Sequence, residues 1–300
     1  MPNLIVIAGP TASGKTDLSI KLAAAYNAEI LSADARQFYR QMDIGTAKPT
    51  SEQLAKIPHH FIDILEPSEN YNAGLFEKEG MSFLESYFKT KDTCILVSGS
   101  GMYINAIIEG FDDLPSTSAE VRERFNTLFD KHGIEHLQTL LKKVDPEYYN
   151  EVDLHNRQRV QRALEAIEMS GKPFSKLRTK QKQKRPFDIH KVVINPPREL
   201  LYQRINKRVD AMLEEGLLEE VNSLVSLKDQ NALKTVGYQE IFDFLEGKRS
   251  IAEAVDKIKQ HTRNYAKRQN TWFKKQSDYA SFLSNEFDPI KRHLDQRLNV

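Results

Sequence analysis

The chain has 300 residues, of which 40% are hydrophobic and 28% are charged, and its formal net charge is +1. This composition is typical of a soluble globular protein, and the length allows one large domain or a core with a smaller inserted domain. No apolar run is long enough for a membrane span, and no signal peptide precedes the first apolar run. The single cysteine, Cys94, cannot form an intrachain disulfide. We expect it in the core of a cytoplasmic protein.

The first sixteen residues contain the pattern around which the rest of the chain is organised. An apolar run at 3–8 predicts a buried strand, and a helical pattern begins near residue 15. Between them stands Gly9-Pro10-Thr11-Ala12-Ser13-Gly14-Lys15-Thr16. This is G-x-x-x-x-G-K-[ST], a loop whose backbone N–H groups and following helix N-terminus attract a phosphate. Lys15 adds positive charge, and the Thr16 hydroxyl is placed to bind Mg²⁺. The pattern predicts a phosphate-binding loop without deciding whether the phosphate belongs to a nucleotide.

A second predicted strand, 28–34, ends in the acid Asp34. Ligands of open parallel sheets lie at the carboxyl ends of strands, so we expect Asp34 to face the phosphate loop. Its alternative role is in a turn or a helix cap. Arg36 and Gln37 follow with donors suited to a base or a phosphate. Residues 42–49 have the composition of a loop.

Further apolar runs predict strands at 61–65, 93–98 and 190–195, with a helix at 72–87 between the first two. This order predicts a doubly wound α/β fold, a P-loop-like parallel sheet with helices on both faces. Residues 115–170 have helical periodicity and little strand signal. We therefore predict a catalytic core from 1–114 and 188–300, with an all-helical domain inserted at 115–187.

Basic residues are concentrated in two stretches, 172–191 and 257–275. One basic stretch is most simply interpreted as solvated surface. Two basic stretches in a nearly neutral chain favour a polyanionic partner. Arg157, Arg159 and Arg162 are too dense for a core face, and they fit either salt bridges with nearby acids or phosphate contacts. The last long helix, about 251–275, has an apolar stripe near heptad spacing that predicts a buried face anchored by Trp272. The residues of this stripe are Val255, Ile258, Thr262, Tyr265 and Trp272.

Taken together, these motifs resemble the tRNA dimethylallyltransferase (isopentenyl-tRNA transferase) family over nearly the whole chain. The phosphate loop alone is generic, but Met-Asp-Ile-Gly-Thr-Ala-Lys-Pro at 42–49 and the Thr-Arg-Asn-Tyr-Ala-Lys-Arg-Gln-Asn-Thr-Trp-Phe stretch at 262–273 are specific. The matching blocks are 9–16, 32–49, 97–104, 156–171, 208–221, 233–241 and 258–273. Where many members have Gly-Gly-Thr-Gly-Leu-Tyr, this chain has Ser-Gly-Ser-Gly-Met-Tyr at 98–103. It has no C-terminal zinc finger of the kind some eukaryotic relatives carry, which favours a bacterial-type enzyme.

The resemblance implies transfer of a dimethylallyl group from dimethylallyl diphosphate to N6 of the adenosine 3′ of the anticodon, at tRNA position 37. It implies that Gly9–Thr16 hold the diphosphate with Mg²⁺ and not ATP, and that Asp34 is the general base. Thr11 and Arg208 would stabilise the leaving group. The implied partner is the anticodon stem-loop of tRNA, gripped in part by the insertion, and we expect a monomer. The implied tRNA contacts are Asp34, Ala35, Arg36, Gln37, Ser100, Arg122, Gln158, Arg159, Val160, Gln161 and Arg162.

Two other functions compete with this interpretation. A nucleotide-binding P-loop kinase that uses ATP and a small hydroxyl substrate would explain Asp34 as a base and the insertion as a lid. It gives no use for the two basic stretches. A non-catalytic RNA-binding module would bind tRNA without turnover. Neither explains the match across so many blocks.

Overall fold

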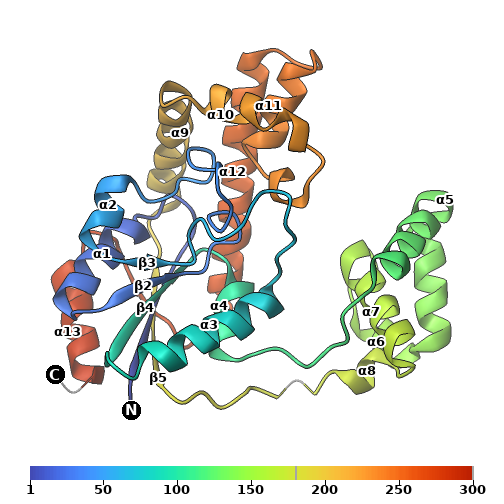
Figure 1. The fold of residues 1–300 in the computed structure, drawn as a ribbon, viewed down its shortest axis with the longest axis horizontal. Coiled ribbons are helices and arrows are strands. Elements are labelled where there is room, and N and C mark those ends of the chain that lie inside the picture. The colour runs from blue at the N-terminus through green and yellow to red at the C-terminus, as the bar shows by residue number, and fades with distance from the viewer. Residues whose placement is uncertain (180, 299–300) are drawn as a thin grey trace. The chain divides into compact units, whose positions relative to one another are not determined.

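A computed structural model describes residues 1–179 and 181–298 (Figure 1). Lys180, one of the basic residues of 172–191, lies outside the described residues. The chain divides into two units, Met1–Glu109 with Lys184–Val300, and Gly110–Gln183. The sequence placed the insertion at 115–187, so the second unit begins five residues earlier and ends four residues earlier than predicted.

The first unit is built on a six-stranded sheet in which every neighbouring pair is parallel. Its strands, in the spatial order β3-β2-β4-β1-β5-β6, are β3 (His59–His60), β2 (Glu29–Ser32), β4 (Thr93–Ser98), β1 (Asn3–Ala8), β5 (Asp188–Ile194) and β6 (Ala280–Phe282). The central strand β1 is buried from Leu4 onward, as expected for a parallel strand covered on both faces. The sheet and its doubly wound order confirm the predicted fold class.

One predicted strand is wrong. Phe61 and Asp63 have φ of 64° and 56°, which no β-strand accommodates. The strand in this part of the chain is the short pair His59–His60, and Leu65 contributes only an isolated bridge to Tyr39. The apolar character of 61–65 therefore reflects packing of individual side chains, as in the edge-on contact of Phe61 with Phe76.

Helices cover both faces of the sheet and extend beyond the carboxyl ends of its strands. Those of the first unit are α1 (Lys15–Ala25), α2 (Ser51–Lys56), α3 (Ala73–Tyr87), α4 (Gly101–Ile108), α9 (Arg198–Glu214), α10 (Leu217–Ser223), α11 (Tyr238–Leu245), α12 (Ile251–Phe273) and α13 (Phe287–Leu298), with 3₁₀ turns at Val225–Leu227 and Asn231–Leu233. One face of the sheet packs on α1 and α13 through a cluster that includes Ile5, Leu22 and Leu294. Helices α9 and α12 lie side by side, with α10 and α11 at their far ends (Figure 1).

The buried face of α12 shares Ile258 with the predicted stripe but otherwise differs from it. Ala254, Ile258, Ala266 and Phe273 are buried, whereas Tyr265 is 40% exposed. A straight helix repeats every 3.6 residues, so a stripe read at heptad spacing drifts off the buried face. Phe273 is buried, whereas Trp272 is half-buried.

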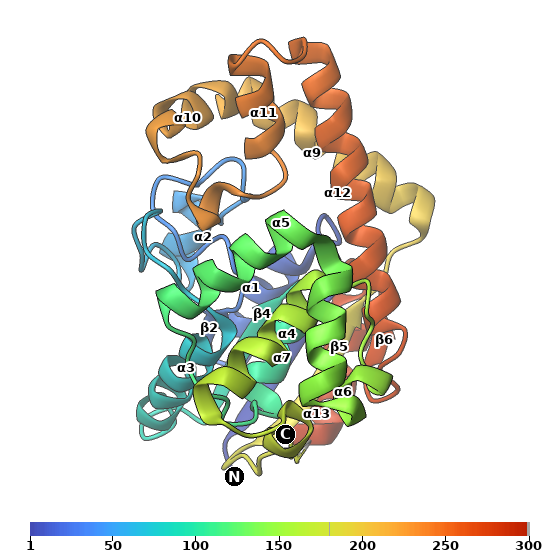
Figure 2. The same cartoon turned by 90° about the vertical axis from the view of Figure 1, so that its right-hand side faces the viewer.

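The second unit is all helical and has its own core. It contains α5 (Ala119–Val144), α6 (Pro146–Glu151), α7 (Arg157–Ser170) and α8 (Phe174–Leu177). Helix α5 is interrupted at Gly133, where φ is 74°, and Figure 2 shows its two segments running in different directions. The core is centred on Leu137, Leu141, Val160 and Leu164.

Two expectations from composition are met in the described residues. Cys94 is buried in β4, and burial raises the pKa of its thiol well above its usual range. None of the helices in the described part of the chain carries the apolar run that a bilayer crossing needs.

Candidate active site

The loop Gly9–Thr16 connects the end of β1 to the start of α1, as the motif requires. Gly9 has φ of 150°, and a Cβ atom there would lie 2.5 Å from the Ile194 carbonyl oxygen. Only glycine therefore allows the loop to approach β5 this closely. Helix α1 begins after Gly14 without a side-chain cap, which leaves the N–H groups of its first turn available to an anion.

Two basic side chains at the phosphate loop, Lys15 of the loop and Arg208 of α9, have lowered pKa values. The Lys15 ammonium donates to the Pro10 carbonyl oxygen at 2.7 Å. Burial, with a smaller contribution from the charge of Arg208, lowers the pKa of Lys15 to about 7, and the Asp34 carboxylate acts in the opposite direction. Burial also lowers the pKa of Arg208, whose guanidinium donates to the Thr11 hydroxyl at 3.4 Å. The site thus concentrates positive charge that an anion would stabilise.

Ser13 is an unsatisfied polar group in the same loop. Its side chain is fully buried, and its hydroxyl has no hydrogen-bond partner among the described residues. A buried polar atom without a partner is costly. A phosphate oxygen bound in the loop would supply that partner.

Helix α12 contacts the phosphate loop through a hydrogen bond and through apolar packing. The buried Gln269 side chain accepts a hydrogen bond from the Thr11 N–H at 2.9 Å and donates to the Gly99 carbonyl oxygen at 2.8 Å. Ala12 packs with Leu201 of α9 and Ala266 of α12. No local sequence signal identifies Gln269 as a site residue, although it lies inside the specific stretch at 262–273.

Asp34 lies where β2 ends, on the same side of the sheet as the phosphate loop. Its carboxylate accepts a hydrogen bond from the Arg36 N–H at 2.9 Å. Its charge acts to raise the pKa of Lys15, against the lowering effects of burial and of Arg208. The charges of Asp34 and Arg208 thus both act on Lys15, and Arg208 also contacts Thr11 of the loop; the sequence selected these three charged residues separately.

The other predicted contacts of the first unit flank this acid. Ala35 is half-buried, and the Arg36 guanidinium donates to the Asn231 carbonyl oxygen at 2.9 Å. The Gln37 amide donates to the carbonyl oxygens of Thr46 and Ala47 at 3.2 and 3.1 Å. Ser100 caps α4 only through its backbone.

Ser98 occupies a position where the family pattern has glycine. Its hydroxyl donates to the Ala33 carbonyl oxygen at 2.6 Å, next to Asp34, and accepts the Ser100 N–H at 2.9 Å. The departure from the family pattern thus adds a buried link between the ends of β2 and β4.

The predicted tRNA contacts of the second unit divide into surface and core residues. Gln158 and Arg159 are exposed, and Arg122 is 60% exposed while its guanidinium lies 3.9 Å from the Glu165 carboxylate. Val160 is fully buried in the helical core.

Polar side chains inside the second unit are mutually paired. The Gln161 amide donates to Asn126 and to Glu165. Arg162 donates to the Thr117 hydroxyl and to the Pro115 carbonyl oxygen, and burial lowers its pKa. Arg157 stacks 3.7 Å from the centre of the Phe129 ring. These side chains are committed to the internal structure of the unit.

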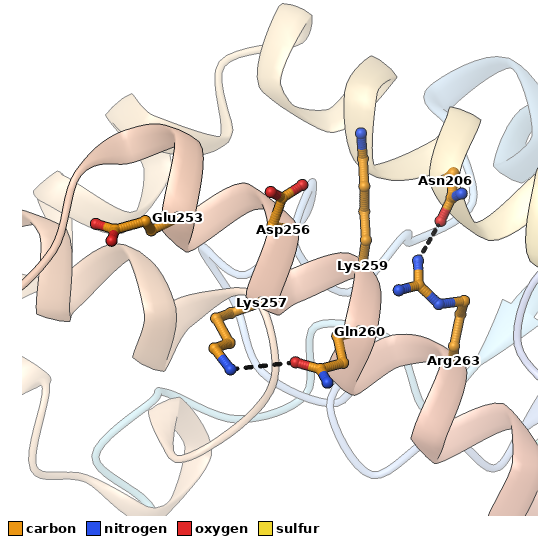
Figure 3. Close-up of a pocket in the computed structure, with 7 residues that line it drawn as sticks. All are labelled: Asn206, Glu253, Asp256, Lys257, Lys259, Gln260 and Arg263. Carbon is orange, nitrogen blue, oxygen red and sulfur yellow. Dashed lines mark hydrogen bonds between the residues drawn. The ribbon is translucent and has the colours of Figure 1, made fainter.

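A groove of about 580 Å³ lies between α9 and α12. Figure 3 shows its cations pointing in different directions, Lys257 toward Gln260 and Arg263 toward Asn206. Lys259 pairs with Asp210. The groove is large enough for a small ligand, but the basic side chains that line it do not point toward a common centre.

A magnesium ion is compatible with the loop, provided that a ligand supplies most of the oxygens. The Thr16 hydroxyl stands in the first turn of α1, directly after Lys15. No group of three or more acidic, histidine or cysteine side chains in the described residues could hold a metal. Mg²⁺ is commonly bound by few protein ligands together with substrate phosphates, so Thr16 with a diphosphate fits this pattern.

A phosphate loop on the central strand of a parallel sheet, with a helical unit inserted between β4 and β5, defines a P-loop-type α/β protein. A model of the IPP transferase family matches residues 37–276. The tRNA dimethylallyltransferase 1 of Bacteroides fragilis is 46% identical over 97% of both chains. That of Bacteroides thetaiotaomicron is 44% identical over 98% of this chain and 96% of its own.

Solved structures agree with the sequence relatives. The tRNA isopentenylpyrophosphate transferase of Bacillus halodurans superimposes with a TM-score of 0.74 at 33% identity, covering 100% of this chain and 97% of its own. A eukaryotic dimethylallyltransferase described as acting on tRNA gives a TM-score of 0.83 at 27% identity, covering 99% of this chain and 78% of its own. The chain belongs to the IPP transferase family and is an enzyme of the tRNA dimethylallyltransferase class, which confirms the resemblance drawn from its motifs.

Proposed function

We propose that this enzyme transfers a dimethylallyl group from dimethylallyl diphosphate to N6 of adenosine 37 of tRNA, giving N6-isopentenyladenosine. The observation that carries the proposal is the juxtaposition of a phosphate loop, two half-buried cations and one carboxylate. Lys15 and Arg208 are at the loop, and the charge of Asp34 acts on Lys15. Since the substrate is tRNA, we expect the reaction in the cytoplasm, and we expect the enzyme to act as a monomer.

At the donor end, the bond between the allylic carbon and the diphosphate oxygen breaks, and the electron pair leaves with the diphosphate. The developing charge would be stabilised by the N–H groups of the first turn of α1, by Lys15 and by Arg208. The Thr11 hydroxyl, which Arg208 contacts, and the unpartnered Ser13 hydroxyl would bind further oxygens. Mg²⁺, held through Thr16, would neutralise charge on the diphosphate when bound.

At the acceptor end, the adenine amine is a weak nucleophile because its lone pair is delocalised into the ring. As N6 forms its bond to the allylic carbon, a proton must leave the nitrogen. We assign the role of accepting it to the Asp34 carboxylate. The adenosine would leave its stack to reach this site, at a cost of a few kcal/mol.

We assign tRNA contacts to two groups of residues. In the first unit these are Ala35, Arg36, Gln37 and Ser100, which flank Asp34. In the second unit, the exposed side chains of Gln158, Arg159 and Arg122 would contact the anticodon stem-loop phosphates. Val160, Gln161 and Arg162 would support that surface from inside the helical unit.

The test is transfer of label from dimethylallyl diphosphate carrying ¹⁴C in the allyl group to unmodified tRNA, with Mg²⁺, and with and without ATP. We expect label in tRNA without ATP, and isopentenyladenosine at position 37 after nuclease digestion. ATP hydrolysis without label transfer would instead support a P-loop kinase. Binding of tRNA with neither reaction would support a non-catalytic RNA-binding module.

Variants assign the roles of individual groups. Asp34→Asn should lose turnover by about 100-fold or more, in the range of general base catalysis, with tRNA affinity retained. Asp92→Asn, an exposed acid before β4, is the matched control. Near-normal turnover of Asp34→Asn would show that another group accepts the proton.

A further inference from the structure

The carboxylate of Glu220 binds the backbone of the loop that contains the Met-Asp-Ile-Gly-Thr-Ala-Lys-Pro stretch. Glu220, in α10, accepts the N–H groups of Asp43, Ile44 and Gly45 at 2.9, 2.7 and 2.9 Å. It also accepts the Tyr238 hydroxyl at 2.6 Å. Four donors converging on one carboxylate constitute a fixed anchor point. We call residues 43–47 the clamped loop.

Packing reinforces this anchor. Tyr238 is fully buried, and its ring lies so close to Gly45 that a Cβ atom there would be 2.5 Å from Cε2. The Glu220 carboxylate raises the pKa of Tyr238 further above its usual range, beyond the larger effect of burial. The hydroxyl therefore remains a donor to Glu220 throughout the physiological pH range.

The clamped loop in turn holds the segment that carries Asp34. The Gln37 amide donates to the carbonyl oxygens of Thr46 and Ala47 at the end of the clamped loop. Upstream, the sheet fixes Ala33, whose N–H donates to the Val97 carbonyl oxygen at 2.9 Å. Asp34 thus lies between one point fixed by the sheet and another fixed, through Gln37 and the clamped loop, by Glu220.

We propose that Glu220 is a positioning residue for the prenyl-transfer reaction, which acts on Asp34 through the clamped loop and Gln37. The inference rests on the proposed role of Asp34 as proton acceptor. Glu220 itself contacts only protein groups. Its loss would leave the phosphate loop intact while loosening the carboxylate that must meet the adenine amine.

The first variant is Glu220→Gln, with Glu219→Gln, an exposed neighbour on the same helix, as its control. The amide can accept only at its oxygen, so its NH₂ group would face backbone N–H donors. With both substrates saturating, we expect kcat to fall about 10- to 100-fold, as displacement of a reacting group by about 1 Å can cause. The KM for dimethylallyl diphosphate should change by less than about twofold, because the diphosphate contacts are retained. Unchanged kcat, or a raised diphosphate KM with normal kcat, would overturn the proposal.

A second comparison separates this proposal from the assignment of Asp34. If Glu220 acts through Asp34, the Asp34→Asn/Glu220→Gln double variant should have the same kcat as Asp34→Asn alone. A further loss of about tenfold in the double variant would show that Glu220 acts by another route. Full turnover of Asp34→Asn would instead remove the base assignment, and this inference with it. The two failures are therefore distinguishable.

Tyr238→Phe keeps the ring on Gly45 and removes one donor, so it tests the anchor even if Glu220→Gln folds poorly. We expect faster hydrogen exchange at the amides of Asp43, Ile44 and Gly45, together with a kcat loss of about two- to fivefold, as for one weakened hydrogen bond. Faster exchange at these amides with normal turnover would refute the proposal, because the clamped loop would then be loosened without consequence for the reaction.

Discussion

The Gln269 side chain accepts the Thr11 N–H at 2.9 Å, which joins the long helix α12 to the phosphate loop. Its amide group donates to Gly99 in the turn after β4. One buried side chain thus fixes two loops at the carboxyl ends of adjacent strands. A Cβ atom on Gly99 would lie 2.5 Å from the Gln269 amide nitrogen, so a larger residue at that position would displace the Gln269 amide.

Gln269→Ala should therefore weaken both folding and donor binding. Two buried backbone groups would lose their partner, and we expect a loss of about 1–3 kcal/mol in the free energy of unfolding. We also expect a rise in the KM for dimethylallyl diphosphate of about tenfold, equivalent to about 1.4 kcal/mol. Urea unfolding and steady-state kinetics measure the two effects. Gln260→Ala, an exposed position on the same helix, should change neither.

The lowered pKa of Lys15 predicts that the protein takes up protons when it binds the diphosphate. With a pKa of about 7, the free side chain is largely neutral above neutral pH, whereas a bound diphosphate favours the charged ammonium. The phosphate groups are themselves ionised above about pH 7. Affinity for dimethylallyl diphosphate should therefore fall, by up to about tenfold per pH unit, as pH rises from about 7 to 9.

Calorimetry in two buffers of different ionisation enthalpy measures the proton uptake directly. Lys15→Met should bind weakly and without this uptake, and Lys21→Met, an exposed lysine of α1, should behave as the parent. Because the unfolded chain binds the Lys15 proton up to about pH 10.4, the contribution of this group to stability rises with pH between about 7 and that value. Binding that is independent of pH in this range would contradict the prediction.

Ser98 should stabilise this chain at a position where many family members have glycine. Its hydroxyl links the Ala33 carbonyl oxygen to the Ser100 N–H. Ser98→Ala leaves both groups without this partner and should lower the free energy of unfolding by about 1–3 kcal/mol. Ser82→Ala, at an exposed position of α3, should have little effect. Thermal unfolding of the two variants and the parent measures these differences in stability.

The two arginines of α7 should respond differently to truncation. Arg159 is exposed, so Arg159→Ala should lower tRNA affinity, reduce the slope of log K against log salt by about 1, and leave stability unchanged. Arg162 holds Thr117 and Pro115, so Arg162→Ala should lower the thermal midpoint. Filter binding over a salt series, with thermal unfolding in parallel, separates the two effects. If Arg159→Ala lowered the thermal midpoint as much as Arg162→Ala does, Arg159 would have a structural role.

Local signals in the sequence were sufficient for much of the fold and for the phosphate loop. The strand at 3–8, the glycines and Lys15 stand next to each other, and Asp34 ends a short apolar run, so each could be recognised within a few residues. What local signals could not reveal is pairing between distant residues. Thr11 and Gln269 are 258 positions apart, and nothing near either one identifies its partner.

The same reason accounts for the errors. The apolar residues 61–65 fit a strand equally well until the backbone at Phe61 and Asp63 is seen. The three-residue strand β6 has no periodicity to detect. Local signals also do not tell which side chains of the arginine-rich stretch face solvent: the helix turns Val160 and Arg162, which stay predicted tRNA contacts, toward the interior of its unit.

The parallel order of the sheet has a consequence for biosynthesis. Strand β1 is made first, yet one of its neighbours is β5, and Asn3 pairs with Asp188, 185 residues later. At about 5–20 residues per second, a ribosome takes about 10–40 s to make that stretch. During this interval one edge of β1 has no partner strand. The inserted helical unit, which has its own core, is synthesised before β5 can pair with β1. The nascent chain must therefore keep an apolar strand from aggregating for many seconds, which makes it a natural client for chaperones at the ribosome exit.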